Sequence, residues 1–97
     1  MRMMLRATMD TGTANDMIKA GQVQGEMKKV LDQMKPEAVY FTADRGKRAC
    51  TIVFDMDDSS RIPVVCEPLF QSFGAEITVQ PCMNLEDLQR GLAALAG

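Results

Sequence analysis

Hydrophobic and polar residues alternate with a period of two in four stretches of this chain. Such alternation predicts β-strands that bury one face and expose the other. The four stretches are residues 3–9, 38–43, 48–56 and 76–83. The third opens the sequence RACTIVFDMDD, the longest run of β-branched and apolar residues, which favours a central strand. Its buried face would carry Cys50, Ile52, Phe54 and Met56.

Helical spacing of hydrophobic residues predicts one long helix after the first strand. It would begin at Thr13, which forms a capping box with Asp16, and end near Met34 because Pro36 prevents its continuation. Gly21 and Gly25 lie inside this helix and weaken it. Either the helix bends at these glycines or the missing side chains let a neighbour pack closely, and we expect close packing.

Two further helices follow the third and fourth strands. Residues 57–60, DDSS, offer caps for a helix whose apolar stripe spans residues 62–73, with Gly74 as its C-terminal residue and a kink expected at Pro68. Asn84 and Asp87 cap the last helix. Its narrow apolar seam suits contact with a sheet edge or another subunit, and consists of Leu85, Leu88, Leu92 and Leu95.

The resulting order, βαββαβ followed by a helix, is that of the ferredoxin-like α+β fold. We therefore expect a single domain, residues 1–97, with a four-stranded antiparallel sheet in the order 4-1-3-2. The two main helices would cover one face of the sheet, and strands one and three would lie at its centre. In a chain of this length only one core is possible, so pairing with a second copy is a natural way to cover remaining apolar surface.

Composition narrows the classes of function. The net charge is −2, and the eleven basic residues are scattered apart from Lys28–Lys29 and the group Arg45, Lys47 and Arg48. This distribution argues against nucleic acid as a partner. The first residues contain no apolar run long enough for a signal peptide or a membrane span, so we expect a cytoplasmic protein without membrane contact. The chain has no histidine, and Cys50, Cys66 and Cys82 lack zinc-site spacing. We expect no metal and buried thiols that pack as small apolar residues.

Three segments carry a resemblance to a known family: RACTIVFDMDDSS, PLFQSFGAEITVQP and the NLEDLQ cap. In these segments the chain resembles small uncharacterised bacterial domains of the dimeric α+β barrel superfamily. The resemblance implies a homodimer whose two sheets pack face to face around a lumen that binds small, often aromatic molecules. Relatives include cofactor-independent quinone oxygenases, muconolactone isomerases, dye peroxidases and haem-degrading enzymes. The absence of His and Trp argues against haem ligation by His and against the Trp and His roles of the quinone oxygenases.

The sheet face without helices would line such a lumen. We expect four residues on it to act in catalysis, namely Arg6, Tyr40, Asp55 and Glu76. Arg6 would bind an anionic or enolate oxygen, Tyr40 would donate to a carbonyl, and enclosure would suit Asp55 to acid–base work. Seven more residues would contact the ligand: Met4, Thr8, Thr42, Thr51, Val53, Thr78 and Gln80.

Structural roles compete with these assignments. Arg6 and Glu76 could form a cross-strand ion pair, Tyr40 could be an interface residue, and Asp55 could be a solvated or capping carboxylate. The function we expect is binding of an aromatic or polyketide-like molecule, with cofactor-independent isomerase, cyclase or oxygenase-type chemistry. The alternative is a non-catalytic ligand-binding or assembly domain.

Two motifs invite other interpretations, and the rest of the chain opposes both. The D-x-D of residues 55–57 after an apolar strand is typical of dehalogenase-type phosphatases, but those need several more parallel strands than this chain can supply. The order of elements is also that of RNA-binding βαββαβ domains. However, Cys50 and Ile52 stand where their stacking aromatic residues would be.

Overall fold

The computed structural model describes the whole chain, residues 1–97, as nine elements. In order they are β1 (Arg2–Thr8), α1 (Thr11–Lys19), α2 (Val23–Met34), β2 (Ala38–Asp44), β3 (Lys47–Asp55), the short 3₁₀ turn η1 (Ser59–Arg61), α3 (Ile62–Phe73), β4 (Glu76–Pro81) and α4 (Leu85–Ala96). None of the helices has the length and apolar content that a membrane span requires.

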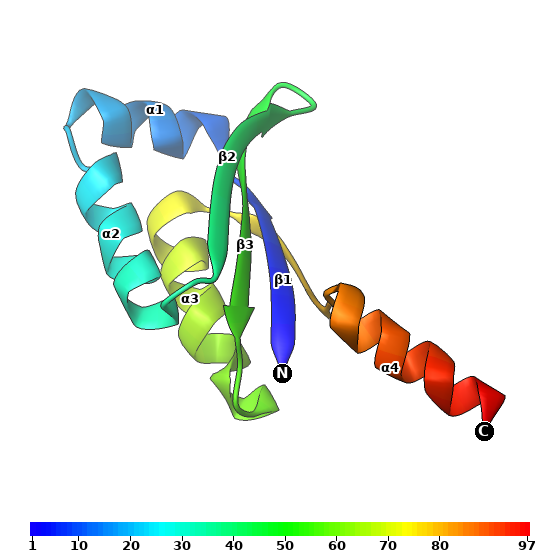
Figure 1. Cartoon of the computed structure of the whole chain (residues 1–97). Helices are drawn as coiled ribbons and strands as arrows, with labels where there is room; N and C mark the ends of the chain where they lie inside the picture. Colours follow the sequence, from blue (N-terminus) through cyan, green and yellow to red (C-terminus); the bar gives the residue numbers. More distant parts are fainter.

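The four strands form one antiparallel sheet in the order β2-β3-β1-β4. This order and the sequence of elements confirm the predicted ferredoxin-like topology with an added C-terminal helix. Helices α1, α2 and α3 lie on one side of the sheet (Figure 1). The stretch RACTIVFDMDD is the central strand β3 followed by the cap of η1, where Asp58 accepts a hydrogen bond from the Ser60 N–H at 2.9 Å.

The core lies between the sheet and these helices, as the alternation predicted. Eighteen buried residues form one cluster. Leu5, Ile52 and Phe54 from the central strands are at most 1% exposed, and Leu69 and Phe73 of α3 are fully buried beside them. Gly74 ends α3 with a φ of 57°, as expected for a left-handed C-terminal residue. The helix continues without interruption through Pro68.

The prediction of one long first helix is wrong. The chain forms α1 and α2 instead, separated at Gly21, whose φ of 69° is incompatible with a continuing right-handed helix. The expected close packing is also wrong, because a Cβ added to Gly21 or Gly25 would meet no atom within 4 Å. Helix α1 begins at Thr11, and its cap is Asp10 rather than Thr13.

Helix α4 extends away from the sheet on the side opposite α1, α2 and α3 (Figure 1). Its predicted cap is confirmed, since Asn84 and Asp87 form a reciprocal capping box. No residue of α4 is buried, so within one chain the helix does not lie along a sheet edge. The long axis of the molecule consequently measures 57 Å against 28 and 17 Å for the others.

Candidate functional site

We call the sheet surface that faces away from α1, α2 and α3 the open face. Strand register arranges its side chains in three cross-strand rows. Beginning near α4, the rows are Ala38, Val53, Met4 and Gln80; then Tyr40, Thr51, Arg6 and Thr78; then Thr42, Ala49, Thr8 and Glu76. Ten of the eleven site residues proposed from the sequence lie in these rows, because period-two alternation fixes the face of each strand residue.

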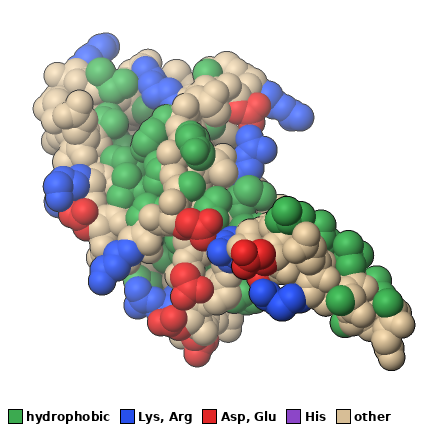
Figure 2. Space-filling view, in the orientation of Figure 1, with side chains coloured by type: hydrophobic (Ala, Val, Ile, Leu, Met, Phe, Trp, Pro, Cys, Tyr) green, Lys and Arg blue, Asp and Glu red, His purple; other side chains and the backbone are tan.

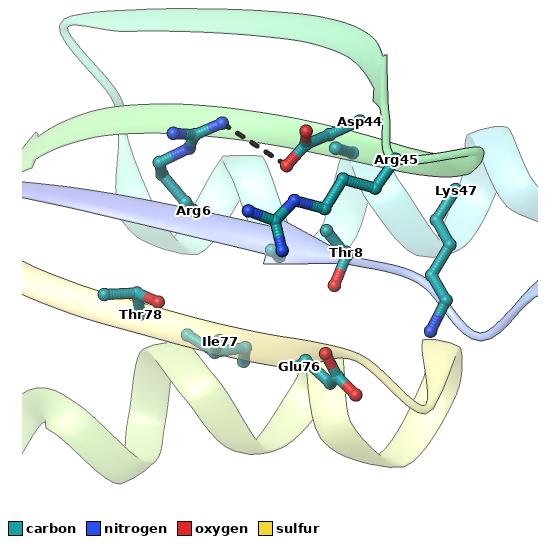
Figure 3. Close-up of a pocket in the computed structure, with 10 residues that line it drawn as sticks. Arg6, Thr8, Asp44, Arg45, Lys47, Glu76, Ile77 and Thr78 are labelled. Atoms are coloured by element: carbon teal, nitrogen blue, oxygen red, sulfur yellow. Dashed lines mark ion pairs between the residues drawn. The ribbon is translucent and has the colours of Figure 1, made fainter.

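A polar hollow of 530 Å³ lies on the open face at the end where β2 and β3 are joined. Figure 3 shows the side chains on its walls. Four residues proposed from the sequence line it: Arg6, Thr8, Glu76 and Thr78. Three others come from the β2–β3 hairpin, namely Asp44, Arg45 and Lys47. The candidate site is therefore smaller than the whole face and is closed on one side by a turn.

The β2–β3 hairpin residues are not among the eleven site residues expected from the sequence. Asp44 pairs with Lys47, which leaves Arg45 and Gly46 as a two-residue loop. Their φ values are 51° and 78°, both positive as a type I′ turn requires. This backbone brings the Arg45 side chain to the hollow (Figure 3). The signal in the sequence was the basic group Arg45, Lys47 and Arg48, two of which line the hollow.

The hollow contains more positive than negative groups. Arg6, Arg45 and Lys47 face two carboxylates, Asp44 and Glu76. Arg6 Nη2 lies 3.8 Å from Asp44 Oδ2, and both side chains are about half exposed. An ion pair this long and exposed contributes little to stability, so Arg6 is free to bind another anion. No carboxylate lies within ion-pair distance of Arg45 or Lys47.

The structure corrects two expectations about charged site residues. The ion pair considered for Arg6 and Glu76 is absent: Arg6 faces Thr78 across the strands and contacts Asp44 instead. Asp55 does not join Arg6 and Glu76. It lies at the far end of β3, borders a different hollow, and contacts the amino group of Met1 at 2.8 Å.

Tyr40 is 72% exposed on the edge strand β2. It lies in the same row as Arg6, but Thr51 of β3 stands between them. Tyr40 and Arg6 are therefore two strands apart, about 10 Å by the usual strand spacing. This separation matches the length of a small aromatic molecule better than the reach of one reacting group.

The thiols lie outside the hollow. Cys50 and Cys66 are buried, and Cys82 is half-buried. Burial raises the pKa of the Cys50 and Cys66 thiols, so both favour the protonated, unreactive form. No group of three or more His, Cys, Asp or Glu side chains is arranged to hold a metal ion.

A second hollow, of 540 Å³, lies on the helix side of the sheet between α2 and β2. We call it the α2–β2 cleft. Its apolar walls include Val23, Met27, Leu31 and Phe41. Phe41 is 58% exposed although Cys50, opposite it on β3, is buried. Hydrophobic side chains are visible between α2 and β2 in Figure 2.

The model of the family described as "Domain of unknown function (DUF3303)" matches residues 1–96 of the chain. The chain belongs to the DUF3303 family. Residues from all four strands of this DUF3303 domain are included in the match. No functionally curated protein matches the chain.

Solved structures are similar to this DUF3303 domain in fold alone. A formyltetrahydrofolate deformylase from Pseudomonas putida KT2440 has 13% sequence identity and a TM-score of 0.52. The similarity covers 84% of this chain and 29% of the deformylase, so the domain corresponds to less than a third of that enzyme. The de novo designed protein Ferredog-Diesel has 8% identity and a TM-score of 0.49, over 84% of this chain and 85% of the design.

Proposed function

We propose that this DUF3303 domain forms a homodimer that binds a small molecule between two open faces. The molecule has an aromatic or similarly flat apolar body and carries an anionic group. The observation that carries the proposal is the surplus of cations in the hollow, where Arg45 and Lys47 have no carboxylate partner.

The charged end of the ligand is assigned to this hollow. A guanidinium group binds carboxylates and phosphates through parallel hydrogen bonds, and the hollow has two such groups: Arg6 on β1 and Arg45 in the β2–β3 turn. Thr8 and Thr78 add hydroxyl groups, which donate as well as accept. An anion here would meet cations on two sides.

The apolar end is assigned to the row nearest α4 and to Tyr40 in the row beside it. Met4 and Val53 are half-buried neighbours on the central strands, and Tyr40 stands exposed beside them on the edge. In a single chain this surface is open to water. A second open face, packed at the usual distance of about 10 Å between sheets, would enclose a flat ring.

The binding proposal is tested with a matched pair of probes, 1-naphthoate and the uncharged 1-naphthamide. Calorimetry or NMR titration should show tighter binding of the carboxylate. Arg45→Gln should weaken 1-naphthoate binding about tenfold, the usual effect of losing one charge-assisted hydrogen bond. Arg61→Gln, in η1 and outside the hollow, is the control and should change binding less than twofold.

Light scattering should give twice the mass of one chain. Equal affinity for the two probes, or an Arg45→Gln variant that binds 1-naphthoate like the parent protein, would refute the anion site. A monomeric mass would refute the enclosed lumen.

One observation favours proton transfer as a second function. The Glu76 carboxylate lies in the same hollow as Arg6 and Arg45, and no cation lies within ion-pair distance of it. Glu76 could remove a proton from a carbon next to a carbonyl, while a guanidinium group stabilises the enolate oxygen. This mechanism uses Arg6 and Glu76 of the four catalytic residues expected from the sequence and needs no cofactor.

Phenylpyruvate tests this chemistry, since it is aromatic, anionic and has exchangeable methylene protons. NMR in D₂O should show faster loss of these protons with the protein than in buffer alone. Glu76→Gln should slow the exchange at least tenfold without weakening 1-naphthoate binding. Exchange at the buffer rate would leave a binding protein without catalysis, which is the alternative function class.

A further inference from the structure

Helix α4 carries a stripe of leucines that the rest of the chain leaves uncovered. Leu85, Leu88, Leu92 and Leu95 are 67%, 40%, 55% and 83% exposed. They follow one another at intervals of three, four and three residues, which is the a and d spacing of a coiled-coil seam. Figure 2 shows hydrophobic side chains along this helix. A seam this narrow fits one facing helix better than a broad core.

The residues beside the seam suit pairing with an identical helix. With Leu85 at position a, the flanking e and g positions hold Gln89, Gly91 and Ala96, none of which is charged. The charged residues of α4 occupy the outer positions b, c and f: Glu86, Asp87 and Arg90. Two copies of the helix can therefore approach without bringing like charges together.

The base of α4 is held firmly, so the seam has a defined direction. Arg2 Nη1 of β1 lies 2.6 Å from Asp87 Oδ2, and Arg2 Nε lies 2.8 Å from Glu37 Oε1. Asp87, whose side chain is 27% exposed, is the least exposed residue of α4. From this anchor the helix runs out on the side of the open face (Figure 1), where the proposed second copy lies.

We propose that α4 pairs with α4 of a second copy through this leucine seam, in a contact related by a two-fold axis. Such a contact uses the same surface on both subunits, which the uncharged flanks permit. The inference rests on the homodimer of the proposed function and adds a second contact to it. Alone, a pair of twelve-residue helices is marginal, so the contact depends on the sheets being held together.

The open face is small, so a stable dimer would need a second contact. Four strands, with about 4.8 Å between neighbours and about six residues of 3.3 Å each, give roughly 400 Å² of flat area per copy. Stable specific dimers bury about 600 to 1,000 Å² per copy. The exposed leucines of α4 would add apolar area to the contact.

Charged residues introduced into the leucine seam test the pairing of the two helices. One variant carries Leu88→Glu and Leu92→Glu, and a second carries Leu88→Lys and Leu92→Lys. Sedimentation equilibrium should show that each variant alone has a dimer dissociation constant at least tenfold above that of the parent protein, because like charges then face each other. An equal mixture of the two should form the mixed dimer with near-parental affinity.

Ala94→Glu is the matched control, because it adds the same charge to an outer position of the same helix, and it should change the constant less than twofold. Circular dichroism checks that the exposed substitutions leave the fold intact. If the variants dimerise like the parent protein, the helix pair is refuted. It is also refuted if both variants dimerise weakly and mixing them does not restore the dimer. If the parent protein is a monomer, both the helix pair and the enclosed lumen are refuted. If the parent protein is a dimer that does not bind 1-naphthoate, only the proposed ligand of the lumen is refuted.

Discussion

Asp10 connects the start of α1 to the end of α3. Its Oδ2 accepts hydrogen bonds from the Thr13 N–H at 2.9 Å and from the Thr13 hydroxyl at 2.8 Å. Its own N–H donates to the Phe73 carbonyl at 3.2 Å. The two hydrogen bonds from Thr13 favour the ionised carboxylate, so they hold the pKa of Asp10 below its ordinary value of 3.8.

Asp10 is one of three aspartates at helix starts whose hydrogen bonds favour the ionised carboxylate. The pKa values of Asp10, Asp58 and Asp87 are all lowered, in each case chiefly by a hydrogen bond from a backbone N–H: that of Thr13, Ser60 and Asn84 respectively. In acid the unfolded chain therefore binds more protons than the folded one. The stabilisation is complete above pH 3.8 and is lost as the pH falls through the lowered values of the folded state.

Replacing Asp10 with Asn should flatten this acid response. Asparagine still offers an oxygen to the Thr13 N–H but has no proton to gain, so stability near pH 7 should change little. Urea unfolding at pH values from 7 to 2 measures the slope. Asp57→Asn, in the exposed loop before η1, should keep the parental slope. An Asp10→Asn slope as steep as that of the parent would contradict the assignment.

At the scale of elements, α1 and α2 show what periodicity alone misses. The apolar stripe of residues 14–34 reads as one helix because both helices face the same core. Gly21 breaks the backbone between them, and Gly25 does not. Both glycines interrupt the pattern equally in the sequence. Only the positive φ of Gly21 distinguishes them, and φ depends on how the two helices meet the sheet.

Alanine substitution should therefore have opposite effects at these two positions. Gly21→Ala forces a Cβ into a left-handed conformation and should cost about 1 to 2 kcal/mol. Gly25→Ala, inside α2, should stabilise the fold by about 0.5 to 1 kcal/mol because it improves helix propensity. Urea denaturation compares the two variants.

Neither added methyl group meets an atom within 4 Å, so steric clashes do not confuse the comparison. Equal effects at both positions would contradict a break that is confined to Gly21.

At the scale of the whole molecule, the alternation of hydrophobic and polar residues predicted the fold and the residues of the open face. It could not predict the hollow. The row that contains Arg6, Thr51 and Thr78 follows from the period-two alternation and the strand order. The contribution of Arg45 does not, because it depends on a turn whose backbone must hold a non-glycine residue at positive φ. Asp55 lies at the far end of β3 and borders a different hollow.

Because the domain has a single core, its free energy of unfolding should depend strongly on each central side chain. Leu69 of α3 is fully buried, and Leu69→Ala should lower the free energy of unfolding by about 2 to 5 kcal/mol. That is a large share of the about 5 to 15 kcal/mol available to a typical domain. Val64→Ala on the same helix, where the side chain is 38% exposed, should cost about 0.5 kcal/mol or less. Urea denaturation distinguishes them, and similar losses would contradict the described core.

The protruding α4 also governs how the protein moves through solution. The radius of gyration is 15.5 Å, whereas a compact chain of this length has about 12.5 Å. An elongated single chain diffuses slowly and leaves a gel-filtration column early, at a volume that resembles a larger particle. Apparent size from elution would therefore overstate the mass of one copy. A dimer that tucks both helices together would be rounder, so association would shift the elution volume less than the doubling of mass suggests.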